Sequence, residues 1–221
     1  MKIVLKFGGT SVGSGKKITN VCDIVQKVKK NNQVIVVSSA LQSTTDELLE
    51  LSENAKKGQV NKKIINDIVQ RHQDAIKDII QDKKIQDEVF EKVSSLIKEL
   101  EKTVEGVIIV KELSDKTRDK IVSFGERLAV PIISAKLRDM GIKSESFTGG
   151  EVGIMTDENF GNASPLMKVT QHNVKNNLSN LLEETVPVIT GFIGATQQGD
   201  ISTIGRGGSD FSASLIGMCL S

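Results

Sequence analysis

The chain has 221 residues, of which 38% are apolar and 26% charged, and it carries a formal charge of +1 at pH 7. This balance is ordinary for one globular domain; it excludes a disordered or fibrous protein and argues against nucleic acid as a partner. No stretch approaches the roughly 20 apolar residues that span a membrane, and the apolar run after Lys2 is too short for a signal peptide, so we predict a cytoplasmic protein without membrane contact.

Short apolar runs alternate with amphipathic stretches at the start of the chain. The pattern predicts a strand over "KIVLKFGG", a helix over "KKITNVCDIVQKVKK", a buried strand over "QVIVVSSA" and a helix over "TTDELLELSENAKK". Thr44 and Glu47 fit a capping box at the start of the second helix. Cys22 and Cys219 each lie within an apolar run with no second ligand nearby, which indicates small core residues rather than a metal site.

The segment from about 60 to 104 has a different character. It holds two apolar stripes at helical spacing and has no glycine between Gly58 and Gly106. It predicts a helical hairpin that turns near Asp82 and Lys83 and lengthens the domain without forming a separate fold. His72 lies on the first stripe, where a core histidine is a better interpretation than a catalytic one.

The rest of the chain predicts one long helix and then a further alternation. The helix runs from about 114 to 140, with Pro131 bending or dividing it and Gly141 ending it. After it we predict a strand over "IKSESF", a short strand over "EVGIMTD", a helix over "MKVTQHNVKNNLSNLLEE", one buried strand over "TVPVITGFIG", a hairpin over "ATQQGDISTIG" and a helix over "SDFSASLIGMCL". The alternation indicates an α/β fold, a three-layer αβα sandwich with a mainly parallel central sheet, whose functional residues gather at the carboxyl ends of the strands.

The loop "KFGGTSVGSG" joins a predicted strand to a predicted helix. Its unpaired amides and the positive end of the helix dipole can hold phosphate oxygens, and Lys6 can reach over the glycines to a transferring phosphate. It is not a Walker loop, because Lys17 stands where Ser or Thr is required, and it lacks the last glycine of a dinucleotide fingerprint, because Ile18 stands there. A simple tight turn is the alternative.

Two further segments combine charge with small or apolar residues. In "STIGRGGSDFSAS", Arg206 offers a planar fork suited to a carboxylate among glycines that let a ligand approach, although Asp210 or Ser209 could be a plain helix cap and Arg206 a surface charge. In "SFGERLAVPI", Glu126 lies in an apolar helical stretch where an unpaired charge is costly. It could accept hydrogen bonds from a ligand ammonium group or form an internal ion pair with Arg127 or another basic side chain.

These segments together carry a resemblance. "KFGGTSVGSG", "SFGERLA" and "STIGRGGSDFSAS" occur in the order and approximate spacing of the aspartate kinases, and "VVSSALQSTTDELL" fits the second loop of that family. Over its whole length the chain resembles the N-terminal part of an aspartate kinase catalytic domain with the amino-acid kinase fold, and the hairpin is similar to that of longer members. The resemblance implies transfer of the γ-phosphate of ATP to the side-chain carboxylate of L-aspartate, giving 4-phospho-L-aspartate, the first step toward lysine, threonine and methionine.

The resemblance also implies roles for individual residues. The element that contacts the ATP phosphates is matched by Lys6, Gly8, Gly9, Thr10 and Ser11. The aspartate-binding set is matched by Ser39, Thr45, Glu126, Arg206 and Ser209, with Glu126 for the amino group and Arg206 for a carboxylate. Lys6 and Asp210 are the implied catalytic pair, in which Lys6 offsets charge on the transferring group and Asp210 orients Lys6. Mg²⁺ is implied together with ATP, and no residue is assigned as its ligand.

The family's catalytic domain continues into strands that carry the adenine and ribose pocket, and then into regulatory ACT domains. Because this chain stops on the apolar helix end "LIGMCLS", we expect a truncated piece without those parts. Such a piece is expected to be inactive, to bind ATP poorly and to self-associate, whereas the full-length enzyme is expected to be a homo-oligomer. Two alternatives stay open: another amino-acid kinase acting on glutamate or acetylglutamate, and a noncatalytic protein that retains the aspartate site.

Overall fold

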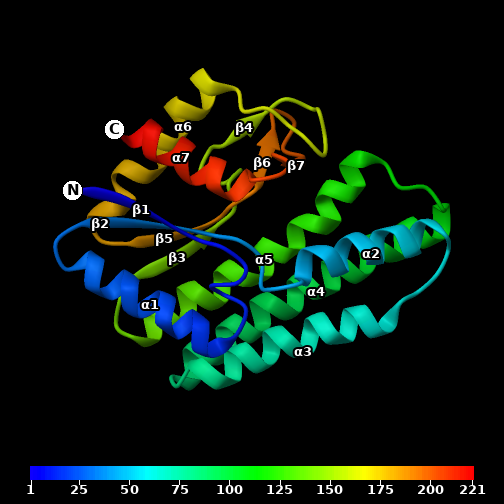
Figure 1. Cartoon of the computed structure of the whole chain (residues 1–221), viewed down its shortest axis with the longest axis horizontal. Coiled ribbons are helices and arrows are strands. Elements are labelled where there is room, and N and C mark those ends of the chain that lie inside the picture. Colours follow the sequence, from blue (N-terminus) through cyan, green and yellow to red (C-terminus); the bar gives the residue numbers. More distant parts are fainter.

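A parallel sheet covered by helices on both faces forms the centre of the computed structural model, which describes residues 1–221 (Figure 1). The elements in chain order are β1 (Lys2–Phe7), α1 (Gly15–Lys29), β2 (Gln33–Ser38), α2 (Thr44–Lys56), α3 (Lys62–Ile79), α4 (Lys83–Val110), α5 (Asp115–Asp139), β3 (Ser144–Phe147), β4 (Met155–Thr156), α6 (Met167–Ser179), the 3-10 helix η1 (Leu181–Glu183), β5 (Val186–Thr190), β6 (Ile193–Thr196), β7 (Ile201–Thr203) and α7 (Gly208–Leu220). No helix is both long and apolar enough to cross a membrane.

The central sheet has the strand order β1, β2, β5, β3, and all its neighbours are parallel. The two inner strands are apolar and almost entirely buried, as strands covered on both faces must be. A smaller sheet, β4, β6, β7, pairs β4 with β6 in parallel and β6 with β7 as an antiparallel hairpin. The predicted α/β class with a mainly parallel sheet is therefore confirmed.

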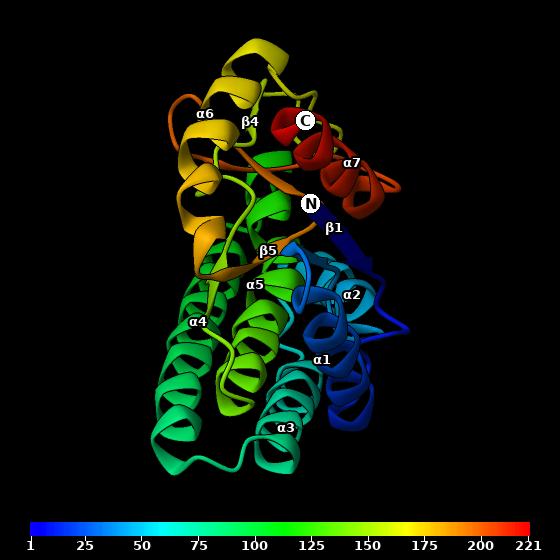
Figure 2. The same ribbon diagram turned by 90° about the vertical axis from the view of Figure 1, so that its left-hand side faces the viewer.

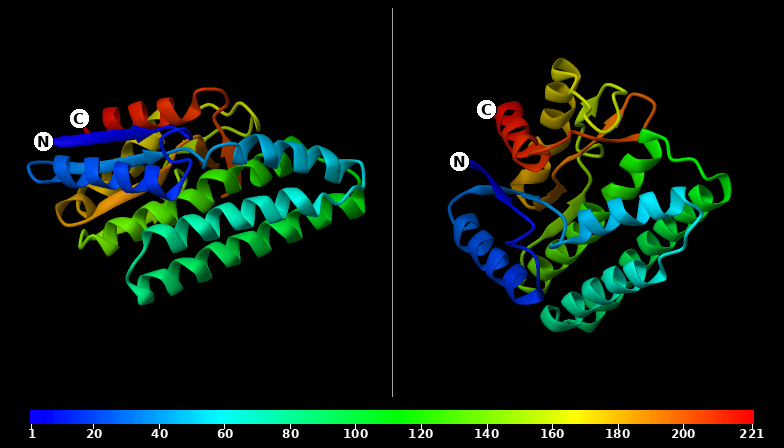
Figure 3. Two further views of the ribbon diagram at one scale, coloured as in Figure 1. Left: turned by 60° about the horizontal axis from the view of Figure 1, so that its bottom comes forward. Right: turned by 45° about the vertical axis from the view of Figure 1, so that its right-hand side comes forward.

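Helices cover the two faces of the central sheet unequally (Figures 2 and 3). On one face, α6 and α7 pack over a cluster of 12 buried apolar residues that includes Ile35 and Val37 of β2. On the other face, α1 and α5 and the helices beyond them share a cluster of 36 buried residues, which takes Val34 and Val36 from the same strand. The alternation of side chains along β2 thus assigns successive residues to two separate cores.

The predicted helical hairpin is confirmed as α3 and α4, which turn at residues 80–82. The Asp82 side chain accepts a hydrogen bond from the Ile85 N–H at 3.1 Å and caps α4. α4 continues to Val110, past the predicted end at 104 and through Gly106. Both stripes join the larger cluster, and His72 is fully buried on α3 as predicted, with Nδ1 2.7 Å from the Ile68 carbonyl oxygen.

The long helix is also confirmed, and α5 runs through Pro131 without dividing. It ends where predicted, because Gly141 adopts a φ of +77° and the Ile142 N–H donates to the Leu137 carbonyl at 2.9 Å, the bonding of a Schellman motif. Both cysteines are buried and unpaired, in agreement with the prediction that they are core residues.

Two local predictions are wrong. Thr44 does not form a capping box with Glu47, because the N-cap of α2 is Ser43 and both carboxylate oxygens of Glu47 pair with Arg71 at 2.6 Å. The segment "TVPVITGFIG" is not one strand. β5 ends at Thr190, and Phe192, with a φ of +66°, turns the chain into β6 of the smaller sheet. The backbone at that one residue separates the two strands.

Candidate active site

A pocket of about 580 Å³ lies where β1 and β2 end. Its walls come from the loops that follow those two strands, the start of α2, the middle of α5, the β5–β6 connection, and the loop that leads from β7 into the first turn of α7. Most residues that the sequence singled out line it together, namely Lys6, Gly9, Ser39, Thr45, Glu126, Arg206, Ser209 and Asp210. Gly8, Thr10 and Ser11 do not line it. The expectation that functional side chains meet at the carboxyl ends of the strands agrees with this arrangement.

Lys6, in β1, reaches the first turn of α7. Its Nζ lies 2.9 Å from Oδ1 of Asp210, and the lysine side chain is the less exposed of the two. The negative charge of Asp210 at a helix N-terminus is favoured by the helix dipole. The ion pair therefore fixes an ammonium group at the edge of the pocket, which fits the predicted role of Asp210 in orienting Lys6.

The end of β2 contacts the start of α7 through two hydroxyls. The Ser39 hydroxyl donates to Oγ of Ser209 at 3.0 Å. This approach depends on Gly191 at the end of β5, since a Cβ there would lie 2.6 Å from Cβ of Ser209. Any larger residue at 191 would push α7 away from the sheet and open the pocket.

Glu126 is the most unusual group in the pocket, because it is a carboxylate that is only 3% exposed and has no cation beside it. The Ala40 N–H donates to its Oε1 at 3.1 Å, whereas Oε2 is buried without a partner. Burial raises the pKa of the Glu126 carboxyl to about 8. An unpaired buried acceptor is costly, and a ligand that supplies an ammonium group would satisfy it.

Arg127 is not that partner, so the predicted alternative of an internal ion pair between Glu126 and Arg127 is wrong. Successive helical residues point about 100° apart, since 3.6 residues make one turn. The Arg127 guanidinium lies 4.5 Å from the centroid of the Phe124 ring and donates to Glu99 at 2.7 Å.

Gly125, the glycine of "FGE", has a separate role in the packing of α5. A Cβ on Gly125 would lie 2.8 Å from Cβ of Ala40, so the close approach of α5 to the β2 loop requires glycine there.

Arg206 is exposed at the mouth of the pocket and makes no ion pair or side-chain hydrogen bond with the rest of the chain. It stands between Gly205 and Gly207, which have φ values of +77° and +74°. Gly207 is the N-cap of α7, and no side chain caps that helix. The guanidinium and the uncapped helix start together make this side of the pocket attractive to anions.

The first glycine loop borders the pocket only in part. Gly9 lines it and Gly8 lies beside Nζ of Lys6, whereas no residue of α1 lines it. Ser14 caps that helix by accepting from the Lys17 N–H at 3.4 Å, and Gly15 packs against the end of α3. The helix starts that border the pocket belong to α2 and α7.

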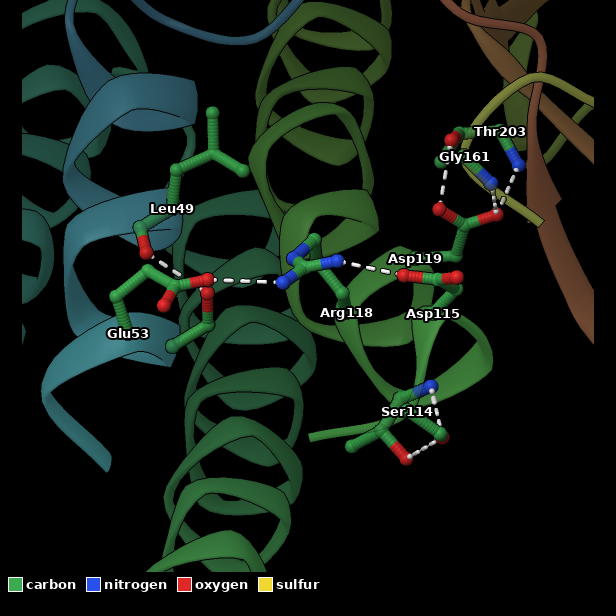
Figure 4. A network of polar contacts seen from close by, with 10 residues as sticks. Leu49, Glu53, Ser114, Asp115, Arg118, Asp119, Gly161 and Thr203 are labelled. Carbon is green, nitrogen blue, oxygen red and sulfur yellow. Dashed lines mark hydrogen bonds and ion pairs between the residues drawn. The ribbon is translucent and has the colours of Figure 1, made fainter. Parts of the chain in front are cut away.

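The sequence interpretation missed Asp119, a second buried carboxylate on α5 (Figure 4). It lies seven residues before Glu126, and that spacing puts both residues on one face of the helix. Its carboxylate accepts hydrogen bonds from the Gly161 N–H at 2.9 Å and from the Thr203 N–H and hydroxyl at 2.8 Å each. The sequence held no signal that could have identified it, because Asp119 lies among the charged residues of the first turns of α5, "DKTRDK".

Metal ligands are not concentrated anywhere in the structure, since no group of three or more His, Cys, Asp or Glu residues could hold a metal ion. Asp46 and Asp210 are the acidic residues of the pocket besides Glu126.

Comparisons with known proteins give one consistent relationship. The model of the amino acid kinase family matches residues 1–221. Chloroplastic aspartokinase 1 of Arabidopsis thaliana is 34% identical over 98% of this chain, and the aspartokinase of Geobacillus stearothermophilus is 31% identical over 96%. The matched region is 38% of the length of each, so the chain spans well under half of these relatives.

The solved structures agree with this relationship. E. coli aspartokinase III in complex with aspartate and ADP superimposes on 100% of the chain with a TM-score of 0.88 and 26% identity, covering 47% of that protein. The Clostridium acetobutylicum aspartate kinase, at 23% identity and a TM-score of 0.77, shares the fold.

Proposed function

Since the chain belongs to the amino acid kinase family, we propose that it carries the amino-acid site of an aspartate kinase, which transfers the γ-phosphate of ATP to the side-chain carboxylate of L-aspartate. The observation that carries the proposal is the pocket in which a buried, unpartnered Glu126 oxygen, a free Arg206 and the ammonium group of Lys6 come together. Aspartate has one ammonium and two carboxylate groups. Lys6 and Arg206 offer counter-charges for the carboxylates. Glu126, whose pKa burial raises to about 8, becomes the counter-charge of the ammonium group when it releases its proton on binding.

The groups of aspartate are assigned by charge and burial. Glu126 receives the ammonium group, because Oε2 is the one buried acceptor in the pocket that lacks a donor. Arg206 binds a carboxylate through its planar fork, and the hydroxyls of Ser39 and Thr45 donate to carboxylate oxygens. The side-chain carboxylate that remains points to Lys6 and the start of α7. E. coli aspartokinase III, one of the similar solved structures, is in complex with aspartate and ADP, which supports this choice of ligands.

The reaction needs positioning more than proton transfer. A side-chain carboxyl with an ordinary pKa of about 4 is already ionised at neutral pH. One of its oxygens attacks the γ-phosphorus, the bond from that phosphorus to the bridging oxygen breaks, and ADP leaves with the electron pair. Lys6 offsets negative charge on the transferring phosphoryl group, Asp210 holds Lys6 in place, and the uncapped start of α7 faces the phosphates.

Magnesium enters this proposal with the nucleotide. Mg²⁺ is usually bound by one or two carboxylates together with substrate phosphates, so the absence of an acidic cluster is compatible with it, and Asp210 is the carboxylate nearest Lys6. When bound, Mg²⁺ neutralises phosphate charge. Since the relatives are more than twice as long, the activity is proposed for the complete polypeptide, which we expect to contain the adenine and ribose contacts.

The site favours aspartate over the substrates of other amino-acid kinases. Acetylglutamate carries a neutral amide in place of the ammonium group, so it offers the Glu126 oxygen one uncharged N–H instead of a charged donor, and charge-assisted hydrogen bonds are roughly twice as strong as neutral ones. Glutamate has one extra methylene, a difference that pockets distinguish by about 1–3 kcal/mol.

The test combines turnover with binding. We expect the complete enzyme to phosphorylate aspartate in preference to glutamate and acetylglutamate, and calorimetry to detect aspartate binding by the 221-residue chain. Lys6→Ala should lower turnover far more than aspartate affinity, because its charge matters most as the phosphoryl group transfers. A preference for acetylglutamate, or a Lys6→Ala enzyme with normal turnover and only a raised KM for aspartate, would show that the assignment is wrong.

A further inference from the structure

Asp119 joins α5 to two segments of chain that lie near Arg206. One is the loop around Gly161, which itself lines the pocket, and the other is β7, which leads through Ile204 and Gly205 to Arg206. Figure 4 shows the dashed hydrogen bonds from both segments to the carboxylate. Asp119 is only 1% exposed, and its three hydrogen bonds are all between 2.8 and 2.9 Å.

The same two segments contact each other next to Arg206. The Ala163 N–H donates to the Thr203 carbonyl at 2.9 Å, and a Cβ built on Gly205 would lie 2.6 Å from Oδ1 of Asn162. The loop around Gly161 therefore packs directly on the residue before Arg206. Once Asp119 fixes that loop and β7, the path of the chain into Arg206 is set.

The Arg206 side chain has no partner of its own, although the Gly208 N–H donates to the Gly205 carbonyl at 3.0 Å and closes a turn around it. Its side chain makes no hydrogen bond or ion pair, and Gly205 and Gly207 on either side adopt left-handed conformations. Glycines lose more conformational freedom on folding than other residues, so the position of this turn also depends on the contacts of the segments that flank it.

We propose that Asp119 is a positioning residue that sets Arg206 for the substrate carboxylate, an inference that rests on the proposed function. Glu126 and Asp119 are seven residues apart on α5. One helix thus carries the group for the ammonium end of the substrate and the group that fixes the arginine for its carboxylate end. The distance between the two recognition points is set by a rigid helix rather than by the flexible loops.

The hydrogen bonds of Asp119 specify which substitutions should succeed. One oxygen accepts both N–H groups and the other accepts the Thr203 hydroxyl, which can equally act as an acceptor. An asparagine with its oxygen toward the amides and its NH₂ toward that hydroxyl keeps all three bonds, so Asp119→Asn should preserve the position of Arg206. Asp119→Leu has a similar size and leaves both amides without an acceptor. Thr203→Val removes only the hydrogen bond from the Thr203 hydroxyl, and it replaces Asp119→Leu as the test variant if the leucine variant fails to fold.

The first experiment follows the Arg206 loop without substrate. Trypsin cleaves after arginine, so the rate of cleavage at Arg206 in the folded chain, followed by mass spectrometry, reports on the order of that loop. Asp119→Leu should raise the rate about tenfold, Thr203→Val less, and Asp119→Asn little, as expected when local opening becomes easier. The matched control is Asp115→Leu, the same change one turn earlier on α5, where the carboxylate contacts Arg118. Equal rates in Asp119→Leu, Thr203→Val and the control would overturn the proposal.

The second experiment is a double-mutant cycle read by aspartate calorimetry. Asp119→Leu should weaken aspartate binding about tenfold in the wild-type chain and less than about twofold in an Arg206→Ala background, because the two residues act as one unit. Equal losses in both backgrounds would mean that Asp119 is merely structural and would overturn the inference. If the wild-type chain binds no aspartate, the proposed function fails, while the cleavage rates still decide whether Asp119 orders the Arg206 loop.

Discussion

Glu126 couples the stability of the chain to pH through its burial. Its pKa is raised from 4.5 to about 8, so between these values the folded state binds a proton that the unfolded state has released. Stability should therefore fall as the pH rises through this range. Since one pKa unit corresponds to about 1.4 kcal/mol, Glu126→Gln should stabilise the chain by a few kcal/mol at pH 8 and have little effect near pH 5.

Urea denaturation at the two pH values measures this difference. Asp46→Asn is a suitable control, because Asp46 lines the same pocket. An equal effect of Glu126→Gln at pH 5 and pH 8 would mean that Glu126 is ionised in the folded chain.

Individual residues also show where sequence interpretation reached its limit. Lys6, Glu126, Arg206 and Asp210 could be predicted as a group through the resemblance of their segments to the aspartate kinases, whereas the charges alone left a plain helix cap, a surface charge or an internal ion pair open. Asp119 was missed because its partners are a loop amide 42 residues away and a strand residue 84 residues away, and neither leaves a pattern in the sequence. The end of β5 was missed for a similar reason, since it depends on the backbone conformation of Phe192.

At the scale of elements, the helical hairpin supports the pocket through the start of α2. Ser43 begins that helix with a φ of +69° and no side-chain cap. In place of a cap, Arg71 of α3 donates to both oxygens of Glu47 at 2.6 Å and to the Thr44 hydroxyl at 3.1 Å. Thr45 lines the pocket in the same turn, so a contact between two helices holds one wall of the site.

Arg71→Ala should consequently destabilise the chain by about 1–2 kcal/mol, the range for hydrogen bonds to charged groups after allowance for partial exposure. Arg138→Ala is the matched control, because Arg138 makes a single bond to Glu88 at 2.8 Å near the surface and should cost less than about 1 kcal/mol. Chemical denaturation of both variants gives the comparison. If they lose the same stability, Arg71 is an ordinary surface ion pair.

Most helices and strands could be predicted because the patterns that indicate them lie within each segment. These patterns are the continuous apolar run of a buried strand, the helical spacing of apolar residues and the glycine that ends a helix. The capping box failed although its two residues were present, since Arg71 lies 24 residues beyond Glu47 and competes for its carboxylate. Residues of the right type at the start of a helix therefore predict a cap, but contacts with other parts of the fold can prevent it from forming.

At the scale of the molecule, one apolar cluster of 36 residues joins the hairpin to the sheet. We therefore expect the chain to unfold in a single transition. Leu100→Ala on α4 should cost about 2–5 kcal/mol and lower the melting temperature of sheet and hairpin alike. Ile109→Ala on the same helix, where the side chain is 73% exposed, is the control and should change stability little. Hydrogen exchange that separates the hairpin from the sheet would contradict this expectation.

The position of β5 has a consequence for how the chain is made. β5 is the last strand of the central sheet to be synthesised, yet it lies between β2 and β3, both of which precede it. A nascent chain that has not reached Val186 therefore holds a β1–β2 pair and a separate β3, each with an open edge, and cannot close the sheet. Such edges bind other strands readily. Ribosome pausing or early termination before Val186 should yield chains that need a chaperone. Synthesis of the few further residues of β5 supplies the strand that joins the β1–β2 pair to β3.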